Sequence, residues 1–363
     1  MRQNTTRKNF LVYDPEEDRL MLWKERYIEM EISGERKRDV EKKIDLQLTR
    51  FIDFFRDRYG YEKVTAVVKR DVTTWLEQLY NPPEKGGRGY APATVNNHQA
   101  ALSRFMKWLR VRAPHLLPED PTKGIREIML PDPKPRTLTS EQVLTLKNIC
   151  DRLERFHLKK DRRRMKGKME LKTHARPRRD RAIVYVLLST GLRREELVNL
   201  NLDQVEPSDP AQLRAARSAK IVRIRGKGKT EGTEYLSADA RAALADYLEF
   251  ERHLDHAEET IALFLSARGT PARKTDGRLY PRSINRILEQ IGKWHDAELK
   301  DPERYISPLR PHDLRHTFAN ELAKHPDVTE QDLERLLRHR NKRYLTVYTR
   351  PPEATSAGFV EKL

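Results

Sequence analysis

The side chains best suited to chemistry lie in one stretch near the C-terminus. His312, Arg315 and His316 are three and four residues apart, so they share one face if this stretch is a helix. His339 and Tyr348 follow, separated by nine positions (348 − 339). Guanidinium groups bind phosphate oxygens, imidazoles transfer protons and an activated phenol can attack as a nucleophile. Cleavage of a phosphate ester needs groups of these three kinds.

The composition favours a polyanionic partner. The chain has 363 residues, with 72 Lys and Arg against 55 Asp and Glu, which gives a net charge of +17. Nucleic acid is the usual partner of so basic a chain. The single cysteine, Cys150, excludes a disulfide within the chain and a multi-cysteine zinc site, and it fits a reducing cytoplasm. No apolar run reaches the length of a membrane span, and the polar N-terminus does not resemble a signal peptide.

The apolar run at 182–188 predicts a buried helix, and a second reactive segment follows it. Gly191 allows the chain to leave that helix and start another. Arg193 would then be held at the junction, where a guanidinium can bind a phosphate through two nitrogens. The plainer alternative is a surface ion pair between Arg193 and either Glu195 or Glu196.

A β-hairpin is predicted further along the chain. Residues 220–225 alternate as a strand does, 226–229 read Gly-Lys-Gly-Lys, and 233–236 form the returning strand. Lys227 lies at the tip, with Lys229 as the alternate candidate for a functional lysine. Residues 203–217 just before the hairpin look like an insertion, and helices are predicted at 238–250, with Ser237 as the N-cap, and at 283–294.

The N-terminal half is predicted to be helical. Residues 1–40 form an arm or an extra helix, and residues 41–115 form a small helical domain. A helix opening at 91–94 has an apolar stripe, and its other face can reach phosphates and base edges unless it is an ordinary solvated face. The candidate DNA-binding side chains on it are Asn96, Asn97, Gln99, Arg104 and Lys107.

Three further segments complete the organisation. Residues 116–136, rich in proline, are predicted to link the helical domain to a catalytic domain at 137–350. The C-terminal tail, 351–363, is hypothesised to dock on a neighbouring subunit. A basic run within 157–181 can follow a DNA backbone, or it is a disordered insertion that repels itself. Its candidate contacts are Arg162, Arg163 and Arg164.

These segments together resemble the tyrosine recombinase (phage integrase) family. The first family box, Thr-Gly-Leu-Arg-x-x-Glu-Leu, is matched in full by residues 190–197. The second, His-x-Leu-Arg-His, is matched by 312–316, and the Gly-Lys-Gly of the family hairpin by 226–228. Leu337-Arg338-His339 stands for the family's Leu-Gly-His, and a tyrosine follows nine positions later.

The resemblance implies a fold and a set of catalytic residues. The fold is mainly α with a small β-hairpin or sheet, in which an N-terminal helical, SAM-like core-binding domain and a C-terminal catalytic domain clamp DNA. Tyr348 is the implied nucleophile, favoured over Tyr344 by its spacing, while His316 packs or orients its neighbours. The implied catalytic set is Arg193, Lys227, His312, Arg315, His339 and Tyr348, with Glu196 as the supporting acid.

The resemblance also implies the activity. A site-specific recombinase of the integrase or transposase type cleaves and rejoins double-stranded DNA through a 3′-phosphotyrosine and a Holliday junction, without metal, ATP or another cofactor. The expected assembly is a homo-tetramer on two duplexes, which an accessory directionality factor could join. The expected location is the cytoplasm, on the nucleoid when bound to DNA, with no membrane association. The alternatives are a relaxing enzyme like a type IB topoisomerase and a DNA-binding protein that has lost catalysis.

Overall fold

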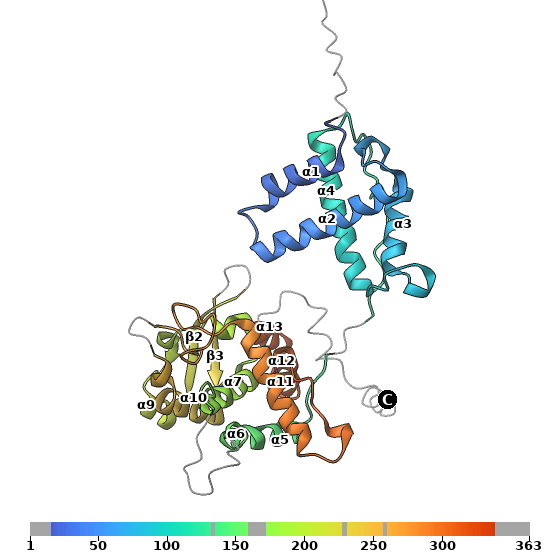
Figure 1. Ribbon diagram of the computed structural model, residues 1–363. Coiled ribbons are helices and arrows are strands. Elements are labelled where there is room, and N and C mark those ends of the chain that lie inside the picture. The colour runs from blue at the N-terminus through green and yellow to red at the C-terminus, as the bar shows by residue number, and fades with distance from the viewer. Residues whose placement is uncertain (1–15, 132–134, 159–171, 227–230, 257–259, 338–363) are drawn as a thin grey trace, which may run out of the picture. The chain divides into compact units, whose positions relative to one another are not determined.

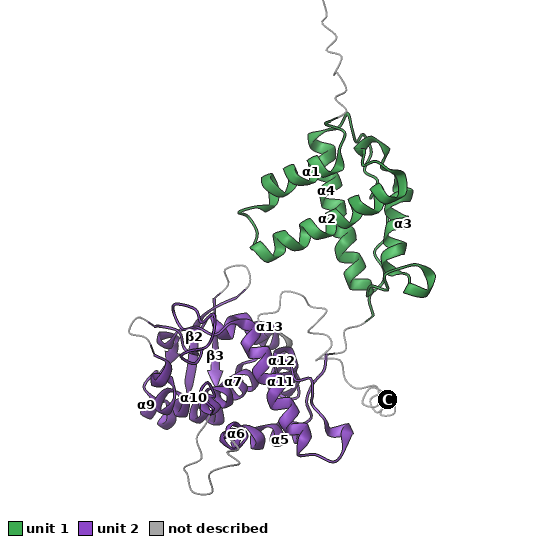
Figure 2. Cartoon of the chain, viewed as in Figure 1, with its two compact units in different colours: residues 1–132 green, residues 133–363 purple. Residues whose placement is uncertain are grey.

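The computed structural model describes residues 16–131, 135–158, 172–226, 231–256 and 260–337. The chain divides into two compact units, Met1–Asp132 and Pro133–Leu363 (Figure 2). Both are built mainly from helices, and the second also contains a three-stranded sheet (Figure 1). The expected fold class, mainly α with a small sheet, is therefore confirmed.

The first unit is a helical domain with an aromatic core. The ring of Trp23 lies edge-on to Trp108, 6.1 Å between centroids, and Tyr27 packs on Phe105 at 5.5 Å. Residues 20–27, from the segment expected as an arm or extra helix, are thus a helix within this core. The helices are α1 (Leu20–Tyr27), continued by a π-helical turn (Ile28–Ile32), α2 (Arg38–Tyr59), α3 (Lys69–Tyr80) and α4 (Pro92–Arg112), with 3₁₀ turns at Val64–Ala66 and Pro83–Lys85.

Local signals explain where these helices begin and end. Gly60 ends α2 with a φ of 76°, a left-handed conformation that costs glycine little. The Asp71 carboxylate accepts a hydrogen bond from the backbone N–H of Val68 at 3.0 Å and so closes the first turn of α3. Pro92 occupies the first turn of α4, where a missing N–H does no harm.

The proline-rich stretch after α4 starts inside the first unit. Leu116 and Leu117 are 2% and 3% exposed, and both belong to the apolar core of that unit. Their burial removes apolar surface from water, which stabilises the unit. The part of the expected linker that precedes residue 132 is thus ordered against the helical domain for much of its length.

Most helices of the second unit and its sheet pack around one large apolar core, while Ala319, Leu333 and Leu337 form a smaller, separate cluster. Thr139 caps α5 through a hydrogen bond from Gln142 N at 3.1 Å, and Ser237, as the sequence predicts, caps α10 through one from Ala240 N at 3.3 Å. The helices are α5 (Ser140–Cys150), α6 (Leu153–His157), α7 (Pro177–Thr190), α8 (Arg194–Val198), α9 (Pro210–Ala215), α10 (Ala238–Phe250), α11 (Pro281–Ala297), α12 (Pro311–Ala323) and α13 (Glu330–Leu337).

The sheet has the order β1–β2–β3, and every pairing is antiparallel. Its strands are β1 (Val205–Glu206), β2 (Ala219–Arg225) and β3 (Glu231–Leu236), so the predicted hairpin is present. The register of β2 shifts between Ile221 and Ile224, and Gln204 Nε2 donates to the carbonyls of Val222 and Arg223 at 2.9 and 2.8 Å. The apparent insertion before the hairpin therefore supplies both a strand and α9, whose Leu213 is fully buried.

Candidate active site

Gly191 makes the turn that brings Arg193 into place. Its φ is 56°, and its N–H donates to Leu187 O at 3.0 Å, which ends α7. A Cβ atom on Gly191 would collide with the ring of Phe318 on α12, whose Cγ would lie 3.2 Å away. Glycine therefore satisfies two demands here: a left-handed backbone and close contact between α7 and α12.

We expect Gly191→Ala to destabilise the second unit by about 2–4 kcal/mol, because a left-handed alanine and a displaced Phe318 ring both cost free energy. Urea denaturation measures the free energy of unfolding. Gly60→Ala is the matched control, since Gly60 has a φ of +76° and a methyl carbon added there would have nothing within 4 Å. Equal losses in the two variants would contradict the steric part of the argument.

Glu196 holds Arg193 at both its backbone and its side chain. The backbone N–H of Arg193 donates to Glu196 Oε2 at 2.9 Å, and its Nη1 donates to Oε1 at 2.8 Å. Glu196 is 5% exposed, whereas the Arg193 side chain remains 29% exposed. The carboxylate thus fixes an arginine whose side chain still reaches the surface.

We expect Glu196→Gln to slow formation of a covalent DNA complex by roughly 10- to 100-fold, because an amide offers one acceptor where the carboxylate offers two, and misplacement of a catalytic group is costly. The measurement is the rate at saturating protein on nicked DNA. Glu195→Gln is the control, since Glu195 is exposed and pairs with Arg194 at 3.1 Å. The same loss in both variants would contradict a specific role for Glu196.

Arg315 is buried and joins three elements of the second unit. It is 3% exposed on α12, its Nη1 donates to the carbonyl of Gly191, and its Nη2 donates to the carbonyl of Leu337 at the end of α13. The helix that carries it begins with Pro311, and Asp313 accepts a hydrogen bond from Arg310 N at 3.0 Å. Arg315 is therefore fixed next to the segment that positions Arg193.

The two histidines of α12 are held in the neutral form. Desolvation by the surrounding protein, and then the positive charges of Arg315, Arg193 and Arg194, lower the pKa of His312. Desolvation, followed by His312 and Arg315, lowers the pKa of His316 to about 4. The two rings lie 6.2 Å apart. At neutral pH, His312 is thus an uncharged imidazole within the field of the arginines.

The structure brings four of the candidate catalytic residues into one region. Arg193 and Glu196 are hydrogen-bonded to each other, and Arg315 donates to the carbonyl of Gly191, two residues before Arg193. The charges of both arginines lower the pKa of His312. Two guanidiniums and a neutral imidazole can together bind the oxygens of a phosphate. The remaining candidates lie outside the described residues: Lys227 and its alternate Lys229, His339, Tyr348 and its rival Tyr344, and Arg162, Arg163 and Arg164.

Two of the proposed DNA contacts in the first unit point inward instead. Asn96 and Gln99 are each 8% exposed. Asn96 Nδ2 donates to Ile128 O at 2.9 Å, its Oδ1 accepts from Ile128 N at 3.0 Å, and Gln99 Nε2 donates to Ile125 O at 3.0 Å. These amides therefore hold the chain that returns along α4. The exposed members of the proposed set are Asn97, Arg104 and Lys107.

Sequence reasoning also missed contributors to the site. Phe318 lies against Gly191, and Arg194 adds to the positive field at His312 while its Nη1 donates to Asn285 Oδ1 on α11 at 3.3 Å. Phe318 follows Arg315 by three positions on the same helix, and this spacing was the available sign. Within the described part of the chain, no three His, Cys, Asp or Glu side chains gather as a metal site.

None of the helices in the described ranges combines the length and the apolar character that crossing a membrane requires.

A sequence model described as the phage integrase family matches residues 138–354, more than half of the chain. Tyrosine recombinase XerC of Myxococcus xanthus is 32% identical over 239 residues, 64% of this chain and 63% of that protein. The match thus spans less than two thirds of that relative. XerC of Chlamydia trachomatis serovar L2 is 27% identical over 316 residues, 85% of this chain and 82% of that protein.

Solved structures share the fold. The Tn1549 transposon integrase in complex with a circular intermediate DNA has a TM-score of 0.64 at 16% identity, covering 94% of this chain and 98% of that one. The XerH site-specific recombinase bound to its difH substrate has a TM-score of 0.62 at 16% identity, covering 94% and 95%. Together with the family match and the meeting of Arg193 and Arg315, these likenesses lead to one conclusion: the chain belongs to the phage integrase family of tyrosine recombinases.

Proposed function

We propose that this chain is a site-specific DNA recombinase that cleaves and rejoins strands through a 3′-phosphotyrosine. The observation that carries the proposal is the meeting of Arg193 and Arg315 around His312, with Glu196 holding Arg193. A phosphodiester repels nucleophiles because it is an anion, and the charge on its oxygens grows as the bond to the nucleophile forms. Two fixed guanidiniums offset that charge, and neutral His312 can donate or accept a proton there.

The remaining roles follow from the family boxes in the sequence. The phenol oxygen of Tyr348 attacks phosphorus and passes its proton to neutral His312, the bond from phosphorus to the 5′ oxygen breaks, and Lys227 gives that oxygen a proton. His339 donates a hydrogen bond to the phosphate. The phosphotyrosine bond keeps the energy of the original diester, so a 5′ hydroxyl can reverse the step without ATP. Neutralisation by arginine leaves the mechanism no need for a metal.

The proposed partner is double-stranded DNA at a specific recombination site. The net charge of +17 favours such a polyanion, and the Tn1549 integrase and XerH were both solved with DNA. We further propose a homo-tetramer on two duplexes, strand exchange through a Holliday junction, an accessory directionality factor, and action on the nucleoid in the cytoplasm. The core-binding domain (41–115) and the catalytic domain (137–350) would hold the duplex between them, with the tail (351–363) docked on a neighbouring subunit.

Capture of DNA from the host tests the activity. Protein covalently joined to genomic DNA is isolated, the DNA is sequenced, and the recovered site is placed twice on one plasmid. Exchange between the two sites is the expected result. Relaxation of supercoils with no exchange would instead mean a topoisomerase-like enzyme, and binding with no covalent adduct would mean that catalysis has been lost.

Trypsin digestion then locates the attacking atom. Trypsin cuts after Arg343 and Lys362 but not between Arg350 and Pro351, so it releases one peptide, residues 344–362, that contains both Tyr344 and Tyr348. Fragmentation of the nucleotide-bearing peptide in a mass spectrometer should place the added mass on Tyr348. Mass on Tyr344 would contradict the assignment of the nucleophile.

A further inference from the structure

His98 in the first unit has both ring nitrogens engaged by partners that determine its protonation. It is 2% exposed on α4, its Nδ1 lies 2.8 Å from Thr94 O, and its Nε2 lies 3.3 Å from Arg50 Nη1. A carbonyl can only accept and a guanidinium can only donate. His98 therefore carries its proton on Nδ1 and presents the lone pair of Nε2 to Arg50, so the ring is neutral.

The surroundings of His98 fix the side chain of Arg50. Trp75 lies edge-on to the imidazole and Tyr90 lies on another side, each with its ring centroid 5.8 Å away. The guanidinium carbon of Arg50 lies 5.7 Å from the centre of the Tyr90 ring. The hydrogen bond to His98 and the contact with the Tyr90 ring together hold the Arg50 guanidinium in one orientation.

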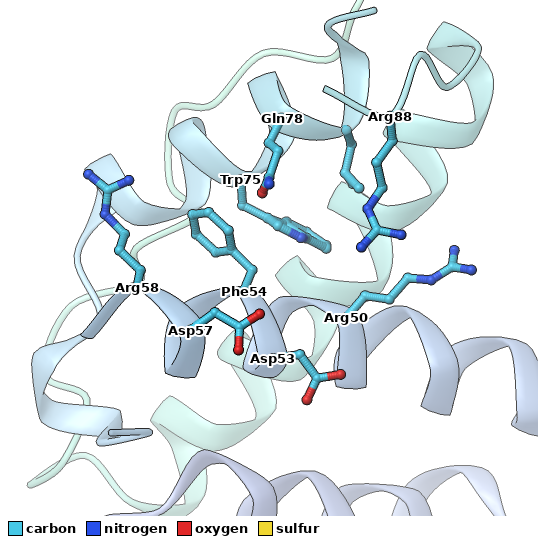
Figure 3. Close-up of a pocket in the computed structure, with 9 residues that line it drawn as sticks. Arg50, Asp53, Phe54, Asp57, Arg58, Trp75, Gln78 and Arg88 are labelled. Atoms are coloured by element: carbon cyan, nitrogen blue, oxygen red, sulfur yellow. The ribbon is translucent and has the colours of Figure 1, made fainter. Parts of the chain in front are cut away.

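Arg50 is one member of a group of cations that we call the α2–α4 basic cluster: Lys43, Arg50 and Arg88. After desolvation, the charges of all three lower the pKa of His98, so all three lie near it. Lys43 and Arg88 are exposed and Arg50 is half-buried. Arg50, Arg88 and Trp75 line one pocket, and Figure 3 shows the two arginine side chains extending to the same side of it.

The acidic side chains nearby do not neutralise this cluster. Asp53 and Asp57 line the same pocket, and Asp53 pairs with Arg56 at 3.6 Å. Among the described residues, no carboxylate forms an ion pair with any member of the cluster. Three like charges that lie near one another without a directly paired carboxylate repel one another, and an external anion relieves that repulsion.

We propose that His98 is a positioning residue for DNA binding: its neutral ring holds Arg50 so that the α2–α4 basic cluster binds backbone phosphates. The inference rests on the proposed function, because it assigns the cluster to the same DNA. A histidine that only filled the core would need no lone pair directed at a cation. Phosphate contacts of this kind give affinity and register but do not read sequence.

Binding of the full-length protein to a fluorescent duplex of random sequence tests this, with the KCl concentration varied. The salt slope is the steepness with which the logarithm of the binding constant falls as the logarithm of the salt concentration rises. Arg50→Ala should weaken binding about tenfold and reduce this slope by about one, the value for one phosphate contact. His98→Phe, which lacks the acceptor, should weaken binding in the same direction. His98→Gln, whose Oε1 can replace Nε2 as acceptor, should retain most of the affinity.

The double variant decides whether His98 acts through Arg50. His98→Phe added to Arg50→Ala should cost nothing further. Arg112→Ala is the matched control: Arg112 is exposed on α4, the helix of His98, but pairs with Glu31 at 3.7 Å, so the salt slope should barely change. An unchanged slope in Arg50→Ala, an equal loss in Arg112→Ala, or an additive loss in the double variant would overturn the proposal.

Two further comparisons keep the test decisive. If His98→Phe does not fold, as judged by thermal unfolding, His98→Asn replaces it, because asparagine can still donate to Thr94 O but its oxygen does not reach Arg50. Covalent capture on nicked DNA at saturating protein should be unchanged in the control variant Arg112→Ala. Failure of capture in the wild type would count against the proposed function, whereas the salt slopes judge the role of His98 separately.

Discussion

Replacing Tyr348 with phenylalanine is expected to abolish the covalent DNA complex. The substitution removes one oxygen and leaves the ring, so the rate of capture should fall by a factor on the order of 10⁴ or more, as it does when other covalent enzymes lose their nucleophile. DNA affinity should change little, because the phenol is uncharged at neutral pH. Denaturing gels of protein mixed with DNA nicked beside the scissile phosphate measure the complex.

Tyr344→Phe is the matched control for this prediction. Tyr344 follows His339 by five positions rather than nine, and Tyr348 has the spacing of the family. The control variant should form the complex at close to the wild-type rate. A complex that persists in Tyr348→Phe and disappears in Tyr344→Phe would reassign the nucleophile.

Replacing Arg315 with alanine is expected to slow cleavage by about 10³-fold or more, because one of the two guanidiniums that offset the phosphate charge is lost. The carbonyls of Gly191 and Leu337 also lose their donor, and this loosens the junction that carries Arg193. The rate of capture at saturating protein measures the effect on chemistry. Thermal unfolding of the same variant separates it from the effect on stability.

A second readout tests whether Arg315 acts at the site itself. The charge of Arg315 is, after desolvation, the largest cause that lowers the pKa of His312, so Arg315→Ala should raise that pKa toward the ordinary value. An NMR titration of the histidine rings follows it. If the pKa of His312 rises, its neutral form dominates only at higher pH. Because the proposed mechanism uses neutral His312, the pH dependence of the residual activity should also shift to higher pH.

Arg315→Lys distinguishes charge from geometry. Lysine keeps the positive charge, so the pKa of His312 should stay low. A single ammonium group cannot reproduce the planar fork that reaches Gly191 O and Leu337 O, so cleavage should remain slow. Wild-type cleavage in Arg315→Ala, or an unchanged pKa of His312 in that variant, would contradict the placement of this guanidinium at the reacting phosphate.

Much of the site could be predicted from sequence because its interactions are local. Arg193 and Glu196 are three positions apart, and a helix start brings such residues together without help from the rest of the fold. His312 and Arg315 share a helix face for the same reason. The cap at Ser237 is equally local, and it was predicted correctly.

The parts that sequence reasoning missed depend on chain segments that are distant in sequence. Asn96 and Gln99 have the polarity of an exposed helix face, yet residues 125–128 return over that face and take up both amides. A periodic pattern reveals which residues share a face, but it does not reveal which segment will cover that face. The pairing of Arg50 with His98, 48 positions apart, has the same character.

By itself, the sequence determined the class of fold, the match to the family boxes and the basic character, because each depends on residue type and on spacings of a few positions. Only the tertiary structure decided that Arg315 bonds to the carbonyls of Gly191 and Leu337, that Phe318 closes on Gly191, and that the first unit extends past Leu117. The physical reason is that a hydrogen bond or a packed ring needs a partner at a given point in space. The folded chain alone brings residues more than a hundred positions apart to that point.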